Sequence, residues 1–279
     1  MEIKSIYENL IFTTVRIETT MKNGSISTGT GFIFSYDIQD KQFLFIVSNK
    51  HVIKDSVRGK LEFTVEKNGE PDLGNKYTLL IDDFEKRWIG HSNADIDIAI
   101  TPFVSILEEL KKNNINIYFR AIQSEIVPDE KATKDIDAVE DIIFIGYPNG
   151  IYDKKNLLPI VRKGITATPA NIDFEGNPTF IIDASIFPGS SGSPVFICNV
   201  GSFTKKSTSR LFAGTRLMFL GIVASVFIKQ DVNKLEIATI PTKDIPIIKT
   251  NQMIDLGIVF KSRCLIEVIE KFLKKHNQI

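Results

Sequence analysis

The chain has 279 residues, of which 43% are hydrophobic and 24% are charged, the composition of an ordinary globular protein with room for two medium domains. Its 34 Lys and Arg balance its 34 Asp and Glu, so its charge gives no reason to expect nucleic acid or an anionic membrane surface as a partner. No apolar run approaches the roughly 18 residues of a membrane span. We therefore expect a soluble protein that binds neither nucleic acid nor membrane.

The amino terminus and the cysteines indicate where such a protein would work. The opening MEIKSIYENL carries charges where a secretory signal would have its apolar core. Only Cys198 and Cys264 occur, too few for a disulfide framework. Both observations predict a cytoplasmic location.

Short segments rich in β-branched and aromatic residues, bounded by Gly, Asn, Asp or Pro, recur along the whole chain and predict β-strands. In the first half they cover residues 12–20, 30–37, 42–48, 76–82 and 95–100. In the second half they cover residues 141–147, 159–168, 179–183, 193–198, 218–228 and 235–240. The pattern is typical of an all-β protein.

Helical patterns are few. Residues 262–275 place apolar side chains on one face and predict a terminal helix that Ser262 would cap. A weaker pattern at 103–113 predicts a helix between two β halves, which we place at residues 1–115 and 116–279. Three segments rich in charge, Gly and Ser are expected to be surface loops: 59–76, 128–137 and 199–210.

The stretch FPGSSGSPVF, residues 187–196, contains three serines. By itself it indicates only a turn, because Gly and Ser are common turn residues. A serine that hydrolyses an amide also needs a base within hydrogen-bond reach and a third group that orients this base. The other residues of the chain must supply both.

The chain has only three histidines as candidates for the base. His276 lies in the terminal HNQI, and His91 lies in a loop-like stretch. His51 directly follows the predicted strand 42–48, and a strand end can present a side chain rigidly. We therefore favour His51.

Asp95 and Asp97 are the candidates for the orienting carboxylate. They are two residues apart, so they would share one face of a strand and periodicity does not separate them. Asp97 directly precedes the apolar run 98–100 and is the one more readily drawn into the interior. The separations from His51 to Asp97 and from Asp97 to Ser191 are 46 and 94 residues, close to the gaps of about 45 and about 93 in the serine-protease template.

With these residues in place, the chain resembles the chymotrypsin-like serine peptidases. The matching pieces are GTGFIF (29–34), SNKHV around His51, DIAI at Asp97, GYP (146–148), GSSGSP (189–194) and GIVAS (221–225). The likeness is greatest to the bacterial trypsin-like peptidases of the high-temperature-requirement and glutamyl endopeptidase groups. It implies two six-stranded antiparallel β-barrels packed side by side, with the triad in the cleft between them; the C-terminal helix is predicted by its own pattern.

The resemblance implies a serine endopeptidase that acts on polypeptides. Ser191 would be the nucleophile, His51 the base and then the acid, and Asp97 the orienting group. The backbone N–H groups of Gly189 and Ser191 would bind the oxyanion. Ser190 occupies the place of the Asp that pairs with a new amino terminus in relatives activated by cleavage, so that activation is not expected.

The resemblance also assigns the substrate-binding residues. Substrate backbone would pair with the strand at Val223, Ala224 and Ser225. A Ser that supports the triad carboxylate in many relatives is replaced by Ala224. The specificity pocket would be shaped by the following residues: Ser185 at its base, Ile186, and Val226 at its mouth. None is charged, which favours a small or medium apolar residue before the cut.

Other interpretations remain open or fail. A catalytically silent module that binds peptides or partners is the alternative function. GTGF (29–32) lacks the Lys and Ser/Thr of a P-loop, and neither H-E-x-x-H nor C-x-x-C occurs, so we expect no nucleotide cofactor and no metal. The basic stretch 203–210 is interpreted as a solvated loop, with docking of a regulatory protein or ligand as the alternative.

Overall fold

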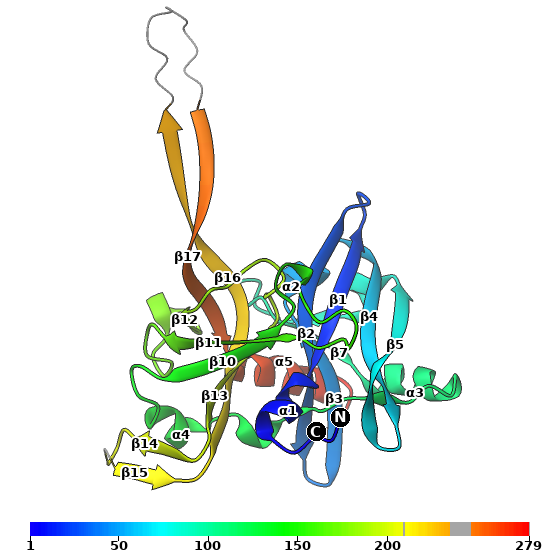
Figure 1. Cartoon of the computed structure of the whole chain (residues 1–279), viewed down its shortest axis with the longest axis horizontal. Helices are drawn as coiled ribbons and strands as arrows, with labels where there is room; N and C mark the ends of the chain where they lie inside the picture. The colour runs from blue at the N-terminus through cyan, green and yellow to red at the C-terminus, as the bar shows by residue number, and fades with distance from the viewer. Residues whose placement is uncertain (209, 235–246, 279) are drawn as a thin grey trace, which may run out of the picture.

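The computed structural model describes residues 1–208, 210–234 and 247–278. Side chains are described outside residues 225–254, and the predicted strand at 235–240 lies outside the described residues. Figure 1 shows two β halves side by side, with the blue and cyan N-terminal strands in one and the green to orange strands in the other. None of the helices described is long and apolar enough to span a bilayer.

The N-terminal half is a nine-stranded sheet in the order β5-β4-β1-β2-β3-β7-β6, with β8 paired to β4 and β9 to β2. Its six longer strands are β1 (Thr14–Met21), β2 (Ile26–Ile38), β3 (Lys41–Ser48), β4 (Ser56–Lys67), β5 (Glu70–Asp82) and β7 (Ala99–Pro102). Three strands of two residues each complete it: β6 (Ile89–Gly90), β8 (Ile117–Tyr118) and β9 (Ile122–Gln123).

The C-terminal half is a closed barrel of six strands in the order β10-β11-β12-β17-β16-β13. The strands are β10 (Asp141–Gly146), β11 (Ile160–Thr166), β12 (Thr179–Asp183), β13 (Pro194–Asn199), β16 (Arg216–Lys234) and β17 (Ile247–Lys261). A separate hairpin, β14 (Ser202–Lys205) and β15 (Arg210–Ala213), lies between β13 and β16 in sequence. β16 and β17 pair as far as Lys234 and Ile247, so they project beyond the barrel as a two-stranded ribbon (Figure 1).

The helices are short except at the end of the chain. They are α1 (Ile6–Ile11), α2 (Lys50–Ile53), α3 (Val104–Lys112), α4 (Glu130–Lys134) and α5 (Ser262–Lys275), with 3-10 turns at η1 (Phe84–Arg87), η2 (Ser124–Ile126), η3 (Pro148–Gly150) and η4 (Phe174–Gly176). The mostly-β fold, with a closed six-stranded barrel in the second half and a terminal helix, is therefore as predicted. The first half differs in detail, because it has nine strands and β9 pairs with β2 in parallel. The cap was wrong: Lys261 is the N-cap of α5, and Ser262 is its buried first residue.

The three predicted loops were also wrong in part, because each contains a regular element. Residues 59–76 lie mainly in β4 and β5, 128–137 contains α4, and 199–210 contains β14. In β4 the buried Leu61 and Phe63 alternate with charged neighbours, and one of these neighbours, Glu62, is itself buried against Arg16 of β1. Because the partner of Glu62 lies on another strand, the sequence alone does not show that this charged residue is compatible with a strand.

A shared hydrophobic core fixes the two halves against each other. One cluster joins Phe34 and Phe45 of the first half to Phe219 of the second and to the apolar face of α5. The rings of Phe32 and Phe219 lie 5.5 Å apart, and those of Phe45 and Phe272 lie 5.6 Å apart, both edge to face. Such aromatic contacts add to the free energy gained by burial. Residues placed on opposite sides of this core can therefore form one rigid site.

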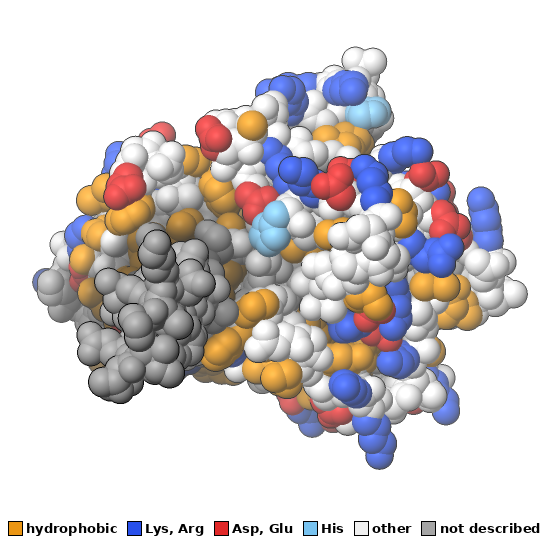
Figure 2. Space-filling model, turned by 90° about the horizontal axis from the view of Figure 1, so that it is seen from above, with side chains coloured by type: hydrophobic (Ala, Val, Ile, Leu, Met, Phe, Trp, Pro, Cys, Tyr) orange, Lys and Arg blue, Asp and Glu red, His pale blue; other side chains and the backbone are white. Residues whose placement is uncertain are grey.

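The surface carries mixed charge. In Figure 2 the cationic and anionic side chains on the described part of one face are interspersed with hydrophobic and polar ones. This distribution matches the balanced composition of the chain.

Candidate active site

The end of β3 positions His51. β3 pairs with β7 so that Ser48 lies opposite Ala99, which brings the residues just before β7 next to the residues just after β3. The chain turns into α2 there, and His51 is its second residue. The His51 side chain is 49% exposed, so it remains accessible from solvent.

Of the two acids considered, Asp97 is the one that contacts His51. The Asp97 carboxylate oxygen Oδ2 lies 2.5 Å from Nδ1 of His51. Its Oδ1 accepts a 3.0 Å hydrogen bond from the backbone N–H of His51. Two bonds to one residue fix both the plane of the carboxylate and the orientation of the imidazole, and they leave Nε2 directed away from Asp97. Asp95 is exposed, and its backbone N–H bonds to Asn93 instead.

Asn49 and Lys50 hold the same loop. The Asn49 side chain is fully buried, and its Nδ2 donates a 2.6 Å hydrogen bond to the carbonyl oxygen of Asp97. Lys50 Nζ donates a 2.7 Å hydrogen bond to the carbonyl oxygen of Asn93. Burial lowers the pKa of the Lys50 ammonium, although the nearby carboxylates of Asp97 and Asp95 oppose this shift. Three consecutive residues, 49 to 51, therefore anchor the loop that carries Asp97.

The turn between β12 and β13 presents Ser191. Gly189 and Gly192 have φ values of 88° and 87°, in the region that glycine adopts without a Cβ penalty. A Cβ on Gly189 would lie 2.6 Å from the carbonyl oxygen of Tyr147, and one on Gly192 would collide with the carbonyl oxygen of Thr30. The sequence of this turn is therefore dictated by its backbone geometry and by close approach to both halves.

Thr30 of β2 ties this turn to the first half. Its Oγ1 donates to the carbonyl oxygen of Gly189 at 2.9 Å and accepts from the backbone N–H of Tyr147 at 3.0 Å. Its backbone N–H donates to the carbonyl oxygen of Ser191 at 2.9 Å. Thr30 is fully buried. One side chain and its own backbone thus set the position of the Ser191 turn relative to the strands that carry His51.

Two backbone amide groups of the Ser191 turn are not used by other described residues. The carbonyl oxygen of Pro188 accepts a 2.5 Å hydrogen bond from the backbone N–H of Asn149. In the described part of the chain, the N–H groups of Gly189 and Ser191 have no protein acceptor. Both N–H groups are therefore available as hydrogen-bond donors beside the partly exposed Ser191 hydroxyl.

Among the three serines of the turn, only Ser191 is partly exposed, since Ser190 and Ser193 are each 1% exposed. The Ser191 hydroxyl donates to the carbonyl oxygen of Ala224 at 3.3 Å. Among the described residues, no hydrogen bond joins Ser191 to His51. In this structure the hydroxyl therefore faces the strand β16.

The other residues expected to bind substrate differ in their backbone pairing and in their exposure to solvent. Val223 does not pair with substrate, because its N–H bonds to Ser193 and its carbonyl oxygen bonds to Gly192. Ser225 and Val226 pair with Ile258 and Gly257 of β17, and their side chains lie outside the described ones. Ser185 is exposed, so it is not buried at a pocket base. Ile186 is 2% exposed and packs in the barrel core against Gly257.

The sequence offered no direct signal for Thr30, Asn49 or Lys50. Thr30 lies in the motif GTGF, and Asn49 and Lys50 lie in SNKHV. The hydrogen-bond partners of all three residues are more than 40 residues away in the sequence. Among the residues that the structure describes, no group of three or more His, Cys, Asp or Glu is arranged to hold a metal ion.

The fold and the family match together define a chymotrypsin-fold peptidase. A family model described as a trypsin-like peptidase domain matches residues 29–201. This range contains His51, Asp97 and Ser191 and covers more than half of the 279 residues. The chain belongs to the family of trypsin-like peptidase domains.

Several solved structures are similar to the chain at low sequence identity. The Rv3671c protease from M. tuberculosis in its active form is 13% identical, with a TM-score of 0.46, over 94% of this chain and 81% of that chain. The HtrA-type protease AlgW with a tripeptide is 15% identical, with a TM-score of 0.49, over 96% of this chain and 62% of that chain. The tobacco etch virus protease with product is 12% identical, with a TM-score of 0.44, over 81% of this chain and 73% of that chain. No curated protein matches the chain.

Proposed function

We propose that the protein is a serine endopeptidase in which Ser191, His51 and Asp97 form the catalytic triad. The observation that carries this proposal is the contact of Asp97 with both Nδ1 and the backbone N–H of His51. In a catalytic triad, a carboxylate orients the imidazole base in this way. The nucleophile would be the partly exposed Ser191 hydroxyl, whose glycine-framed turn is held to the N-terminal half by Thr30.

The chemical steps follow from this arrangement. Ser191 Oγ turns from the Ala224 carbonyl, gives its proton to His51 Nε2 and bonds to the carbonyl carbon of the scissile peptide. The N–H groups of Gly189 and Ser191 stabilise the resulting oxyanion. His51 then returns the proton to the leaving amine, and an acyl-enzyme remains. Water repeats the sequence with His51 as base, which releases the acid and restores the Ser191 hydroxyl.

We infer that the nucleophile turn is ordered from within the chain. Ser190 stands where a charge would receive a new amino terminus in the relatives activated by cleavage, and it is buried. The three hydrogen bonds of Thr30 supply an ordering contact without such a charge. Ala224 and Ser225 are the remaining candidates for pairing with substrate backbone.

A small or medium apolar residue before the cut is the proposed preference. No charged residue occupies Ser185, Ile186 or Val226, the three positions assigned to the specificity pocket. The expected discrimination is modest, because one methylene in an apolar pocket contributes only about 1 to 3 kcal/mol. A peptide library profile dominated by Arg, Lys or Glu before the cut would contradict this preference.

One observation favours a second candidate, a silent module that binds peptides without cleaving them. The Ser191 hydroxyl bonds to Ala224 and not to His51 in the described structure. A silent module would keep this bond when peptide binds, whereas the peptidase would break it.

Cleavage of an unfolded protein substrate tests the peptidase proposal. The full chain should produce fragments whose new termini are identified by mass spectrometry, and the Ser191→Ala variant should produce none. Peptide binding by both proteins with cleavage by neither would instead support the silent module.

A further inference from the structure

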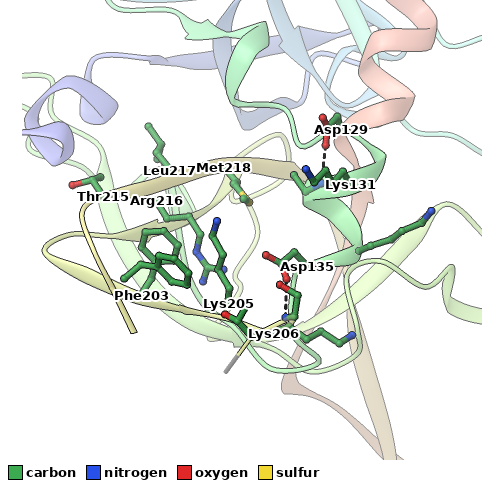
Figure 3. Close-up of a pocket in the computed structure, with 15 residues that line it drawn as sticks. Asp129, Lys131, Asp135, Phe203, Lys205, Lys206, Thr215, Arg216, Leu217 and Met218 are labelled. Atoms are coloured by element: carbon green, nitrogen blue, oxygen red, sulfur yellow. Dashed lines mark hydrogen bonds between the residues drawn. The ribbon is translucent and has the colours of Figure 1, made fainter. Parts of the chain in front are cut away.

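A cavity of about 940 Å³ lies between α4, the hairpin β14–β15 and the start of β16. We call it the α4 cavity, and Figure 3 shows the side chains that line it. It shares no residue with the candidate active site. Met218 of β16 supplies part of its lining, is half-buried and shares a strand face with Arg216, whereas its neighbour Leu217 points to the other face. Methionine packs adaptably against different apolar partners, so this part of the lining suits an apolar side chain.

Four side chains in this cavity form a column. Phe203 and Phe212 stack with ring centroids 5.9 Å apart. Lys205 Nζ lies 4.7 Å from the centre of the Phe212 ring, and Arg216 Cζ lies 5.3 Å from that of Phe203. Each ring is therefore covered by the other ring and by a cation. Because these faces are taken, a flat aromatic ligand has little room to stack here, and the rings offer mainly their edges.

The acids that line the cavity are occupied within the chain. Asp129 accepts a 2.7 Å hydrogen bond from the backbone N–H of Ala132 and caps α4. Asp135 accepts a 2.9 Å hydrogen bond from the backbone N–H of Ser207, which joins α4 to the hairpin. Both carboxylates therefore have structural partners, although their charges remain.

The cations are in excess. Arg216 is buried and paired with Glu140 through both terminal guanidinium nitrogens. In the described part of the chain, four lysines of the lining make no salt bridge: Lys131 and Lys134 from α4, and Lys205 and Lys206 from the hairpin. Lys131, Lys134 and Lys206 are exposed. A chain with no net charge thus places free ammonium groups on two elements that border one apolar surface.

The hairpin offers a further means of binding. Within the described residues, β14 and β15 pair only with each other. A two-stranded sheet has unpaired backbone donors and acceptors along its outer edges, and an extended peptide can add to such an edge.

We propose that the α4 cavity docks an acidic, extended peptide segment of another protein. Its carboxylates would contact the lysines of α4 and of the hairpin, and an apolar side chain between them would pack on Met218. The free ammonium groups favour an anion, the covered rings disfavour a flat aromatic ligand, and the hairpin edge favours a peptide. The site goes beyond the proposed peptidase activity, and its occupancy does not depend on that activity.

A fluorescent hexapeptide of alternating Glu and Leu is the probe. Its binding to the full chain carrying Ser191→Ala, which prevents consumption of the probe, is measured by fluorescence anisotropy at low and at high salt. We expect saturable binding that weakens as salt rises, because salt screens exposed charges. A peptide with Lys in place of Glu should not bind, and one with Ser in place of Leu should bind at least several-fold more weakly.

Variants locate the site. The pair Lys131→Gln and Lys134→Gln should weaken binding roughly tenfold, since each exposed ion pair contributes up to about a factor of five. Lys206→Gln should weaken it by a smaller factor. The matched pair Lys154→Gln and Lys155→Gln, which are exposed and lie outside this lining, should leave binding unchanged. Lys205 is left in place because it packs on Phe212.

Several results would overturn the proposal. Absence of saturable binding would exclude an acidic peptide of this kind. If the control pair Lys154→Gln and Lys155→Gln reduced peptide affinity equally, the peptide would be attracted to surface lysines in general and not to the α4 cavity. Octanoate that binds as tightly as the peptide, and competes with it, would show that the cavity takes a small amphiphilic acid instead.

Discussion

The side-chain amide of Asn49 donates a 2.6 Å hydrogen bond to the backbone carbonyl oxygen of Asp97. Asn49 is fully buried at the start of α2, 48 residues before the Asp97 that it contacts. The site has Ala224 where many relatives of the resembled family have a supporting Ser. Asn49 thus provides a contact by which the position of the Asp97 carboxylate can be fixed without that hydroxyl.

Replacing Asn49 by Ala should lower kcat by roughly tenfold to a hundredfold while KM stays nearly constant, because a misplaced catalytic group affects the chemical step more than binding. The measurement is steady-state hydrolysis of a peptide found by library screening. Asn75→Ala is the matched control, since Asn75 is exposed and also donates through Nδ2, but to the carboxylate of Asp72. Equal activity of Asn49→Ala and Asn75→Ala would remove Asn49 from this role.

Gly192→Ala should reduce the reactivity of Ser191 by more than tenfold. The added Cβ would collide with the Thr30 carbonyl oxygen and lie 2.8 Å from Ser48 Oγ, so the nucleophile turn must shift. Gly69→Ala is the control, because Gly69 has a similar φ of 80° with nothing within 4 Å. Both variants should lose stability through backbone strain. Only Gly192→Ala should also slow the covalent labelling of Ser191 by a fluorophosphonate probe.

Glu62 should make stability depend on pH in the acidic range. Its burial would raise its pKa, but the hydrogen bond from Lys76 and the charges of Lys60, Lys76 and Arg16 outweigh this and lower it. The folded state then binds fewer protons than the unfolded state as the pH falls toward the ordinary glutamate pKa. The stabilisation is therefore present at neutral pH and is lost as the pH falls through the lowered pKa.

Glu62→Gln should cost about 3 kcal/mol of unfolding free energy at pH 7, since it leaves the buried Arg16 without its full partner. The difference from the unaltered protein should narrow as the pH is lowered. Asp82→Asn, which breaks the exposed Arg58–Asp82 pair, should cost less than about 1 kcal/mol. Urea unfolding across pH measures both, and a Glu62→Gln effect that grows in acid would contradict the assigned direction.

Cys264 should resist alkylation in the folded protein. Burial raises the pKa of its thiol to about 12, and the residue is fully buried among the α5 core contacts. The thiolate is the reactive form, so iodoacetamide at pH 7.5 should modify Cys264 only after denaturation. Mass spectrometry of digests gives the extent of modification, and rapid modification of the native chain would show that α5 opens readily.

The sequence predicted those parts of the fold and site that local patterns record. The terminal helix follows from the apolar face of residues 262–275, and the contact of His51 with Asp97 was predicted from their separation of 46 residues. The hydroxyl direction of Ser191 could not be predicted, because it depends on where β16 places the Ala224 carbonyl.

Contacts between distant strands explain what the sequence did not reveal. Glu62 resembles a surface residue until Arg16 of β1 is placed beside it, and so β4 was interpreted as a loop. The sequence does not distinguish Thr30 from other threonines, because its partner Gly189 is 159 residues away and only the fold brings them together. Val223 was expected to bind substrate, but its backbone is used by the nucleophile turn.

Covalent labelling with a fluorophosphonate probe tests the proposed triad most directly. The full chain should be labelled at one site, which digestion and mass spectrometry should locate at Ser191, and Ser191→Ala should not be labelled. His51→Ala should lose nearly all labelling, because the hydroxyl then lacks its base. Failure of the unaltered chain to react at any pH between 6 and 9, or equal labelling of Ser191→Ala, would contradict the triad.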